Sequence, residues 1–184
     1  MKLRHPAPFL DSLHWQVPAR QRPPAAACHW LLDQGSLTRR LQALGHFRVE
    51  PRSQQISVPG AAEARLLGLP ARRRALIREV VLHVDDLPVV YARSVLPLAS
   101  LKGANRVLGH MARRSLGAEL FRRPAAQRVA LWVAEWPASQ LPLTVTAPCW
   151  GRQSLFLKRG HPLLVAEVFL PTLYQLASSA ATRR

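Results

Sequence analysis

The sequence predicts an α+β domain built around a single antiparallel sheet. Two observations lead to this prediction. The spacing of apolar residues changes from a helical period to a period of two after Gly45, and short turn signals join consecutive apolar segments as hairpins. Helical segments precede the hairpins and lie between them, which is typical of a sheet covered by helices on one side.

The N-terminal region is predicted to be a proline-rich arm, residues 1–28, followed by two short helices. Five prolines in the arm forbid a long helix and favour an extended chain. A first short helix is expected at 30–32. A second is expected at 36–45, where Ser36 is a suitable N-cap and Gly45 a C-terminal stop.

Hairpins account for most of the remaining chain. Asp85-Asp86 is a turn signal inside the first hairpin, and residues 159–162 form the turn of the last. Residues 99–121 are predicted to be short helices interrupted by three glycines, and 176–184 a C-terminal tail. The expected strands are 46–58, 75–84, 89–96, 129–136, 154–158 and 163–170.

Length and composition restrict the class of protein. A chain of 184 residues favours one domain, here placed at 29–175. Two cysteines, Cys28 and Cys149, exclude a disulfide scaffold and a four-cysteine zinc site, and the histidines lack the spacing of metal ligands, so no metal is expected. No apolar stretch reaches the ~20 residues of a membrane-spanning helix. Without a secretory signal, we expect a cytoplasmic protein with reduced thiols.

The charge of the chain is strongly positive. Lys and Arg number 26 against 10 acidic residues, a net charge of +16. Such an excess is typical of proteins that bind nucleic acid, an anionic surface or an anionic ligand. The basic residues are scattered rather than clustered in a tail, and no nucleic-acid-binding motif accompanies them. We therefore expect no nucleic-acid partner, although a basic nucleic-acid-binding protein stays an alternative, as does peripheral contact with an anionic surface.

Three charged residues fall within strongly apolar strand segments. Glu167 has apolar neighbours on both sides, which implies burial and the need for a cation or a proton. A two-residue turn at Asp85-Asp86 would place Arg78 directly opposite Arg93, and a four-residue turn would make them diagonal neighbours on the same face. Two facing guanidinium groups need an anion between them, either Glu167 or a bound carboxylate. The simpler alternatives are a structural ion pair for Glu167 and solvent-facing arginines.

Taken together, these three residues predict a buried pocket for a small carboxylate. Two arginines can bind a planar anion in a bidentate manner. A carboxylate beside them can accept a hydrogen bond or transfer a proton. This chemistry does not by itself name a reaction.

Over residues 29–175 the sequence resembles the chorismate pyruvate-lyases of ubiquinone biosynthesis. The resemblance consists of six short segments that occur in the same order with similar spacing. They are Trp30–Asp33 with Gly35–Leu41, Ile77–Val80, Tyr91–Pro97, Arg114–Phe121, Trp150–Ser154 and Pro162–Pro171.

The resemblance implies a fold, a reaction and a set of site residues. The fold would be a sheet of about six antiparallel strands, with helical flaps over a buried ligand. The reaction would remove pyruvate from chorismate to leave 4-hydroxybenzoate, without metal or cofactor. Arg78 would hold the ring carboxylate of the ligand, assisted by the backbone N–H groups of Leu37 and Leu116. Glu167 would contact the opposite end of the ligand, and Arg93 would be a further arginine of the site.

Catalysis would then rest on Glu167, Arg78 and Arg93. Glu167 is the candidate for proton transfer, and the arginines would stabilise charge on the departing enolpyruvate or anchor the ligand. The flaps would be 36–44 and 99–121. The main alternative is a non-catalytic effector-binding module of the same fold, which normally follows a DNA-binding domain too large for residues 1–28. A monomer is expected.

Overall fold

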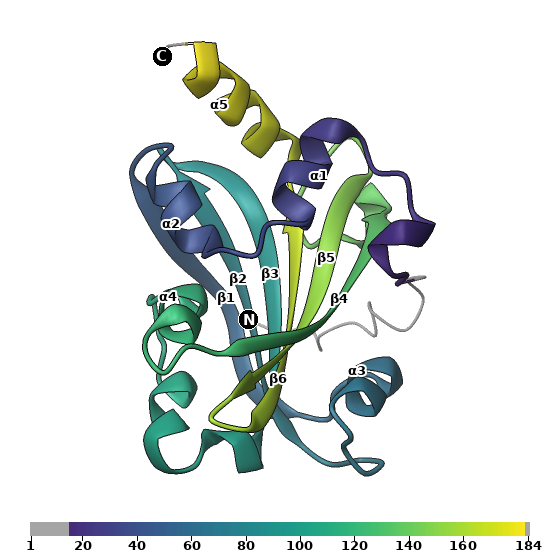
Figure 1. Cartoon of the computed structure of the whole chain (residues 1–184), viewed down its shortest axis with the longest axis vertical. Coiled ribbons are helices and arrows are strands. Elements are labelled where there is room, and N and C mark those ends of the chain that lie inside the picture. The colour runs from purple at the N-terminus through teal and green to yellow at the C-terminus, as the bar shows by residue number, and fades with distance from the viewer. Residues whose placement is uncertain (1–14, 183–184) are drawn as a thin grey trace.

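A six-stranded antiparallel sheet organises the chain in the computed structural model, which describes residues 15–182. The strand order is β1-β2-β3-β6-β5-β4, so the two central strands, β3 and β6, join two halves (Figure 1). The predicted α+β class and single sheet are confirmed. The strands are β1 (Phe47–Ser57), β2 (Ala75–Val84), β3 (Leu87–Pro97), β4 (Gln127–Trp136), β5 (Cys149–Lys158) and β6 (His161–Phe169).

Two tight turns fix the hairpins of this sheet. Asp85 and Asp86 both have positive φ, 47° and 62°, between β2 and β3. Arg159 and Gly160 have φ of 51° and 78° between β5 and β6. Positive φ at both central residues matches the right-handed twist of the flanking strands. The Asp85 carboxylate also accepts a hydrogen bond from the His46 backbone N–H at 2.8 Å, which ties this turn to the start of β1.

Helices cover both faces of the sheet, not one as predicted. The first face carries helices from the N-terminal third and from the segment between β3 and β4, and α5 packs at its end; α3 lies on the second face. The expected short helices at 30–32, 36–45 and 99–121 are present. The helices are η1 (Pro18–Arg20), α1 (Ala25–Leu31), α2 (Leu37–Gln42), α3 (Ala61–Leu66), η2 (Leu98–Leu101), η3 (Gly103–Gly109), α4 (Leu116–Phe121), η4 (Ala138–Gln140) and α5 (Pro171–Thr182).

The expected terminal segments partly belong to regular structure. Most of the arm at 1–28 lies outside the described residues, but α1 already begins at Ala25, and Gln16 forms an isolated antiparallel bridge with Val133 of β4. The segment 176–182 of the expected tail is the second half of α5. Within residues 15–182, none of the helices has the length and apolar character needed to cross a membrane.

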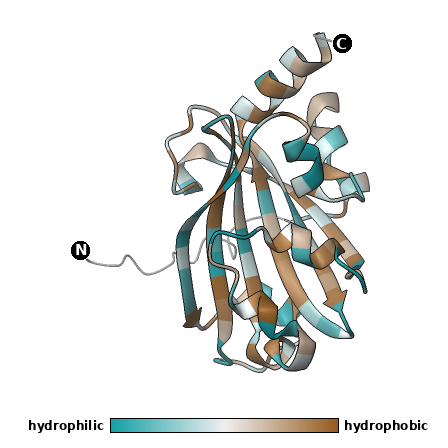
Figure 2. Cartoon of the chain, turned by 90° about the vertical axis from the view of Figure 1, so that its left-hand side faces the viewer, coloured by the Kyte–Doolittle hydropathy of each residue, from teal (hydrophilic) through white to brown (hydrophobic). Residues whose placement is uncertain are grey.

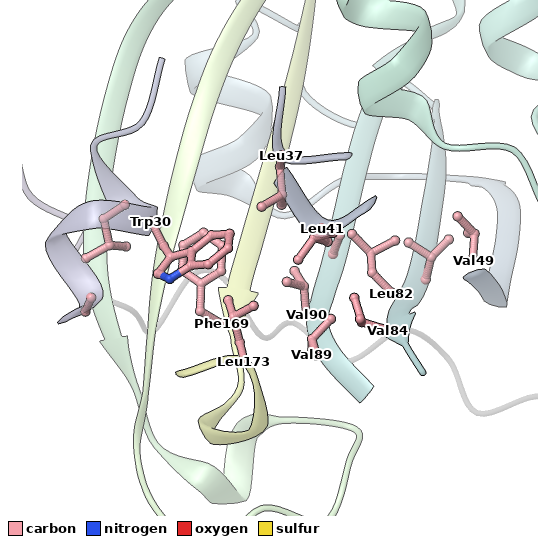
Figure 3. Packing of buried hydrophobic residues seen from close by; sticks show 14 of the residues in the cluster. Trp30, Leu37, Leu41, Val49, Leu82, Val84, Val89, Val90, Phe169 and Leu173 are labelled. Atoms are coloured by element: carbon pink, nitrogen blue, oxygen red, sulfur yellow. The ribbon is translucent and has the colours of Figure 1, made fainter. Parts of the chain in front are cut away.

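The first face holds two groups of buried apolar residues. Figure 2 shows that the strands of the sheet carry long hydrophobic stretches. In one of the two groups, Leu37 and Leu41 of α2 pack onto the strand residues Leu82 and Val90 (Figure 3). In the other, apolar residues of η3 and α4 pack onto β2, β3 and β6. Between these two groups the same face carries charged side chains, and this is where the candidate site lies.

Lys158, at the end of β5, fastens the C-terminal end of α4 to the sheet. Its side chain is only 4% exposed, and burial lowers its pKa. The last carbonyls of a helix have no partner within the helix, so a buried ammonium group can satisfy several of them at once. Nζ donates to the carbonyls of Glu119, Leu120, Arg122 and Pro124 at 2.9, 3.3, 2.8 and 2.7 Å.

We expect Lys158→Met to lower the free energy of unfolding by about 3 kcal/mol, because buried carbonyls would lose their only charged donor. Urea unfolding followed by tryptophan fluorescence measures this loss. Lys102→Met, which removes an exposed lysine, is the matched control and should change stability by less than about 0.5 kcal/mol. Equal effects of the two substitutions would contradict the role given to Lys158.

Candidate active site

A buried cavity lies between the first face of the sheet and the helices α2 and α4. Its empty volume is about 550 Å³, counting the space at its mouth. The side chains that line it come from all six strands and from both helices. They are Leu37, Thr38, Val49, Arg78, Val80, Leu82, Ala92, Ser94, Ser115, Leu116, Gly117, Leu120, Phe121, Arg128, Arg152, Phe156, Val165 and Glu167.

Arg78 on β2 brings a positive charge to this cavity. The residue is 2% exposed, and Nη2 donates to the carbonyls of Ala112 and Arg114 at 3.0 and 2.9 Å. Burial lowers the pKa of its guanidinium group. Among the residues described, no carboxylate forms an ion pair with Arg78, and its Nε has no hydrogen-bond partner. A buried arginine without a carboxylate partner is suited to bind an anion from outside the chain.

Leu37 and Leu116 each begin a short helix at the cavity. Each follows a serine N-cap: Ser36 accepts a hydrogen bond from the Arg39 N–H at 3.4 Å, and Ser115 accepts one from the Ala118 N–H at 3.3 Å. Backbone N–H groups in a first helical turn have no partner within the helix. The two residues that the resemblance pairs as backbone donors therefore lie on opposite flaps of one cavity.

The two flaps touch each other through a hydroxyl pair. Thr38 Oγ1 of α2 lies 2.6 Å from Ser115 Oγ, at the N-cap of α4. A Cβ atom at Gly117 would lie 2.8 Å from Thr38 Oγ1, so a glycine is needed for this close approach. The contact joins α2 and α4 beside the cavity, and the two helices lie side by side in Figure 1.

Glu167 on β6 has a cation partner that the sequence analysis did not name, Arg152. The two residues face each other across β5 and β6, and Arg152 Nε donates to Glu167 Oε2 at 2.6 Å. Arg152 is 1% exposed, and its Nη1 donates to the carbonyls of Trp30 and Asp33 at 2.8 and 3.0 Å. The two-residue turn at 159–160 pairs these strands without a bulge, whereas the expected turn at 159–162 and the expected strand 154–158 leave Arg152 outside the predicted pairing.

The predicted facing of Arg78 and Arg93 is wrong. The two-residue turn is present, and Val84 faces Leu87, but the register then shifts between Leu82 and His83. Val89 has no partner on β2, so from there Arg78 faces Ser94, while Arg93 faces Glu79. A shift of one residue moves every following side chain to the other face of the sheet.

Arg93 consequently lies on the second face, outside the cavity. Its Nε and Nη2 donate to the two carboxylate oxygens of Glu63 at 2.9 and 3.1 Å, and its Nη1 donates to Glu79 at 2.6 Å. Glu63 is 1% exposed and belongs to α3. The two carboxylates raise the pKa of Arg93 against the opposing effect of burial. This arginine holds α3 on the sheet.

Arg128 on β4 is a further cavity residue that the sequence analysis missed. Its Nη1 donates to the Asp33 carbonyl at 2.8 Å, and its guanidinium carbon lies 5.1 Å from the centre of the Phe156 ring. A bulge between Arg128 and Ala130 brings its side chain to the first face. No sequence pattern predicts this bulge, so the position of the Arg128 side chain could not be inferred from the sequence.

The charged residues of the cavity are three arginines and one glutamate. Arg152 and Glu167 neutralise each other, which leaves Arg78 and Arg128 with positive charge toward the cavity. A pocket of this kind can bind a small ligand with two negative charges. Among residues 15–182 there is no group of three or more His, Cys, Asp or Glu side chains that could hold a metal ion.

Comparison with known proteins gives a consistent result. The family model described as chorismate lyase matches residues 9–179. A probable chorismate pyruvate-lyase of Alcanivorax borkumensis is 59% identical over 146 residues, which cover 79% of this chain and 70% of that protein. One of Methylococcus capsulatus is 45% identical over 159 residues, which cover 82% of this chain and 98% of that protein.

Solved structures share the fold at low sequence identity. The crystal structure of PhnF from Mycobacterium smegmatis has a TM-score of 0.58 and 17% identity, over 77% of this chain and 66% of that chain. The effector domain of the same protein has a TM-score of 0.55 and 17% identity, over 76% of this chain and 91% of that chain. At this identity the likeness concerns the fold alone.

The Arg152–Glu167 pair yields a prediction about stability. We expect Arg152→Met to lower the free energy of unfolding by about 2–4 kcal/mol, because a half-buried carboxylate loses its partner and the buried guanidinium contacts are removed. The double substitution Arg152→Met with Glu167→Leu should recover at least half of this loss, because it removes both charges. Urea unfolding of the two single variants and the double variant completes the cycle. A double variant no more stable than Arg152→Met would contradict the pairing.

Proposed function

The chain belongs to the chorismate lyase family, and we propose that it eliminates pyruvate from chorismate to give 4-hydroxybenzoate, a step of ubiquinone biosynthesis. The observation that carries this proposal is the cavity itself. It is lined by apolar side chains and has an unpaired buried arginine on β2 and a carboxylate on β6. Incubation of the purified chain with chorismate, with the appearance of 4-hydroxybenzoate followed by absorbance, tests it directly.

Binding in this cavity would use Arg78 as the anchor for the ring carboxylate of chorismate. Its Nε has no partner among the described residues and offers a charged donor, while Nη2 is held by the carbonyls of Ala112 and Arg114. The backbone N–H groups of Leu37 and Leu116 would assist from the two flaps. Because the surrounding side chains are apolar, the ligand exchanges water for fixed donors, and each charged hydrogen bond becomes stronger.

The elimination itself breaks one C–O bond and one C–H bond. The ring C3–O bond of the enolpyruvyl ether breaks, the ring C4 loses a proton, and the ring becomes aromatic. The leaving fragment takes up a proton at its methylene carbon and is released as pyruvate. Aromatisation supplies a large driving force, so the protein has to orient the substrate and support the transfer of one proton.

Glu167 is the residue of this site suited to that proton transfer or to holding the ring hydroxyl. Its Oε2 is held by Arg152 at 2.6 Å, which fixes the direction of the carboxylate. Arg152 thus positions Glu167 without being free for the substrate. Arg93 takes no part in this mechanism, because its guanidinium group is bound by Glu63 and Glu79 on the other face.

The contact between the two flaps has a consequence for turnover. The Thr38–Ser115 contact holds the two flaps together beside the cavity, so we expect a ligand to leave when α2 and α4 separate. Product release is therefore expected to be slow.

We expect Arg78→Ala to weaken binding of 4-hydroxybenzoate at least about 100-fold, because the ring carboxylate loses its charged donor. Leu37→Met is the matched comparison: it retains the backbone N–H and the packing volume, and should change binding by less than about threefold. Titration followed by fluorescence quenching measures both. Equal losses would contradict the contacts given to these residues.

We expect Glu167→Gln to lower kcat by about 100-fold or more while changing the affinity for 4-hydroxybenzoate only a few-fold. Glutamine keeps the shape of the side chain but cannot transfer the proton. Steady-state kinetics and product titration separate the two effects, and the unfolding midpoint checks that the variant folds. An unchanged kcat would leave Glu167 with a structural role only.

A further inference from the structure

Arg128 has a donor edge that no group of the described chain uses. Its Nη1 donates to the Asp33 carbonyl at 2.8 Å and lies 3.3 Å from Gln34 Oε1. Its Nε and Nη2 are shielded from solvent and have no hydrogen-bond partner within residues 15–182. Two buried charged donors on one side chain are costly unless an acceptor reaches them.

The same edge of another arginine in this protein binds a carboxylate. Arg93 donates from Nε to one oxygen of Glu63 at 2.9 Å and from Nη2 to the other at 3.1 Å. The pair Nε and Nη2 is therefore the side-on fork that matches the two oxygens of a carboxylate. Arg128 has this fork free, and the side chain lines the cavity.

Among the described residues, no carboxylate forms an ion pair with Arg128. Glu167 is bound by Arg152 at 2.6 Å, and Asp33 Oδ1 forms an ion pair with Arg40 at 3.6 Å, while Asp33 Oδ2 has no hydrogen-bond partner there. Arg128 and Arg152 both donate to the Asp33 carbonyl, so the two positive groups lie close together. Burial and the charge of Arg152 lower the pKa of Arg128, which means that an added negative charge here would be stabilising.

Arg128 also lies far across the cavity from Arg78. The first belongs to β4 and the second to β2, and three strands separate them in the sheet. Phe156 lies under the guanidinium group of Arg128, at 5.1 Å from its carbon to the ring centre, and helps to hold its plane. The cavity thus has one free arginine on each side of the carboxylate of Glu167.

We propose that Arg128 binds the second carboxylate of a dicarboxylate substrate, the enolpyruvyl carboxylate of chorismate, through Nε and Nη2. This inference rests on the proposed function and adds a substrate-binding residue to it. Arg78 would hold the ring carboxylate, so the two ends of the dianion are bound by different strands. Elimination separates the two carboxylates, and 4-hydroxybenzoate then keeps only the contact with Arg78.

The test compares ligands with two carboxylates and with one. Arg128→Met should raise KM for chorismate about 10- to 100-fold, the effect of a lost charged bidentate contact, and change the Kd of 4-hydroxybenzoate by less than about threefold. Arg65→Met, which removes an exposed arginine of α3 on the other face, is the matched control and should change neither constant. Arg128→Lys keeps the charge without the fork and should fall between the wild type and Arg128→Met.

Each remaining outcome decides the question. An unchanged KM in Arg128→Met, or an equal weakening of both ligands, would overturn the inference. If Arg128→Met fails to unfold cooperatively, the Arg128→Lys comparison decides instead. If the wild type does not convert chorismate, the proposed function fails. Calorimetric titrations then still test the role of Arg128, because the Kd of chorismate should depend on this residue and the Kd of 4-hydroxybenzoate should not.

Discussion

The Arg152–Glu167 ion pair is the constraint on which the site depends. A carboxylate that is shielded from water needs a cation to offset its charge. It also needs a hydrogen bond to fix its orientation. Arg152 settles both needs because it faces Glu167 directly across β5 and β6 and is itself held by the carbonyls of Trp30 and Asp33. Those carbonyls belong to the end of α1 and the segment before α2, so the pair also fastens the first flap to the sheet. The charge that remains in the cavity is then carried by Arg78 and Arg128 alone.

Much of the fold could be predicted from local patterns. All six expected strands are present, since the apolar period of two and the turn signals act over a few residues, but β5 begins at Cys149, five residues before its expected start. The helix α2 was foreseen from its N-cap Ser36, and α4 lies within the segment 99–121 that was expected to form short helices. The helix α3 was not: its buried residue Glu63 is stabilised by Arg93, thirty positions later, and no local pattern records such a contact. Because α3 was not predicted, the sheet was expected to be covered by helices on one face only.

The site was predictable only where register was regular. Arg78 and Glu167 lie in the cavity as the sequence indicated, whereas a single unpaired residue, Val89, carries Arg93 to the opposite face. A bulge of one residue has no fixed sequence signature, yet it reverses every side chain beyond it. The β5–β6 hairpin has no such shift, but its turn is two residues shorter than expected and β5 begins before the expected strand 154–158, so the pairing of Arg152 with Glu167 was not foreseen. Arg128 depends on a second bulge, in β4, and could be located only from the structure.

The distribution of charge in the cavity bears on how one site can bind its substrate and still release its product. A dianion satisfies both free arginines, so the closed state of the flaps is favoured while the substrate is intact. After elimination each product carries one carboxylate, and no single product can hold both arginines. In the proposed mechanism the aromatic product would then lie beside the Thr38–Ser115 contact with only Arg78 as its charged partner. Release then requires the separation of two short helices that are fastened by different buried cations, α2 through the Arg152 network and α4 through Lys158. The same devices that keep water from the reaction therefore set the barrier to opening.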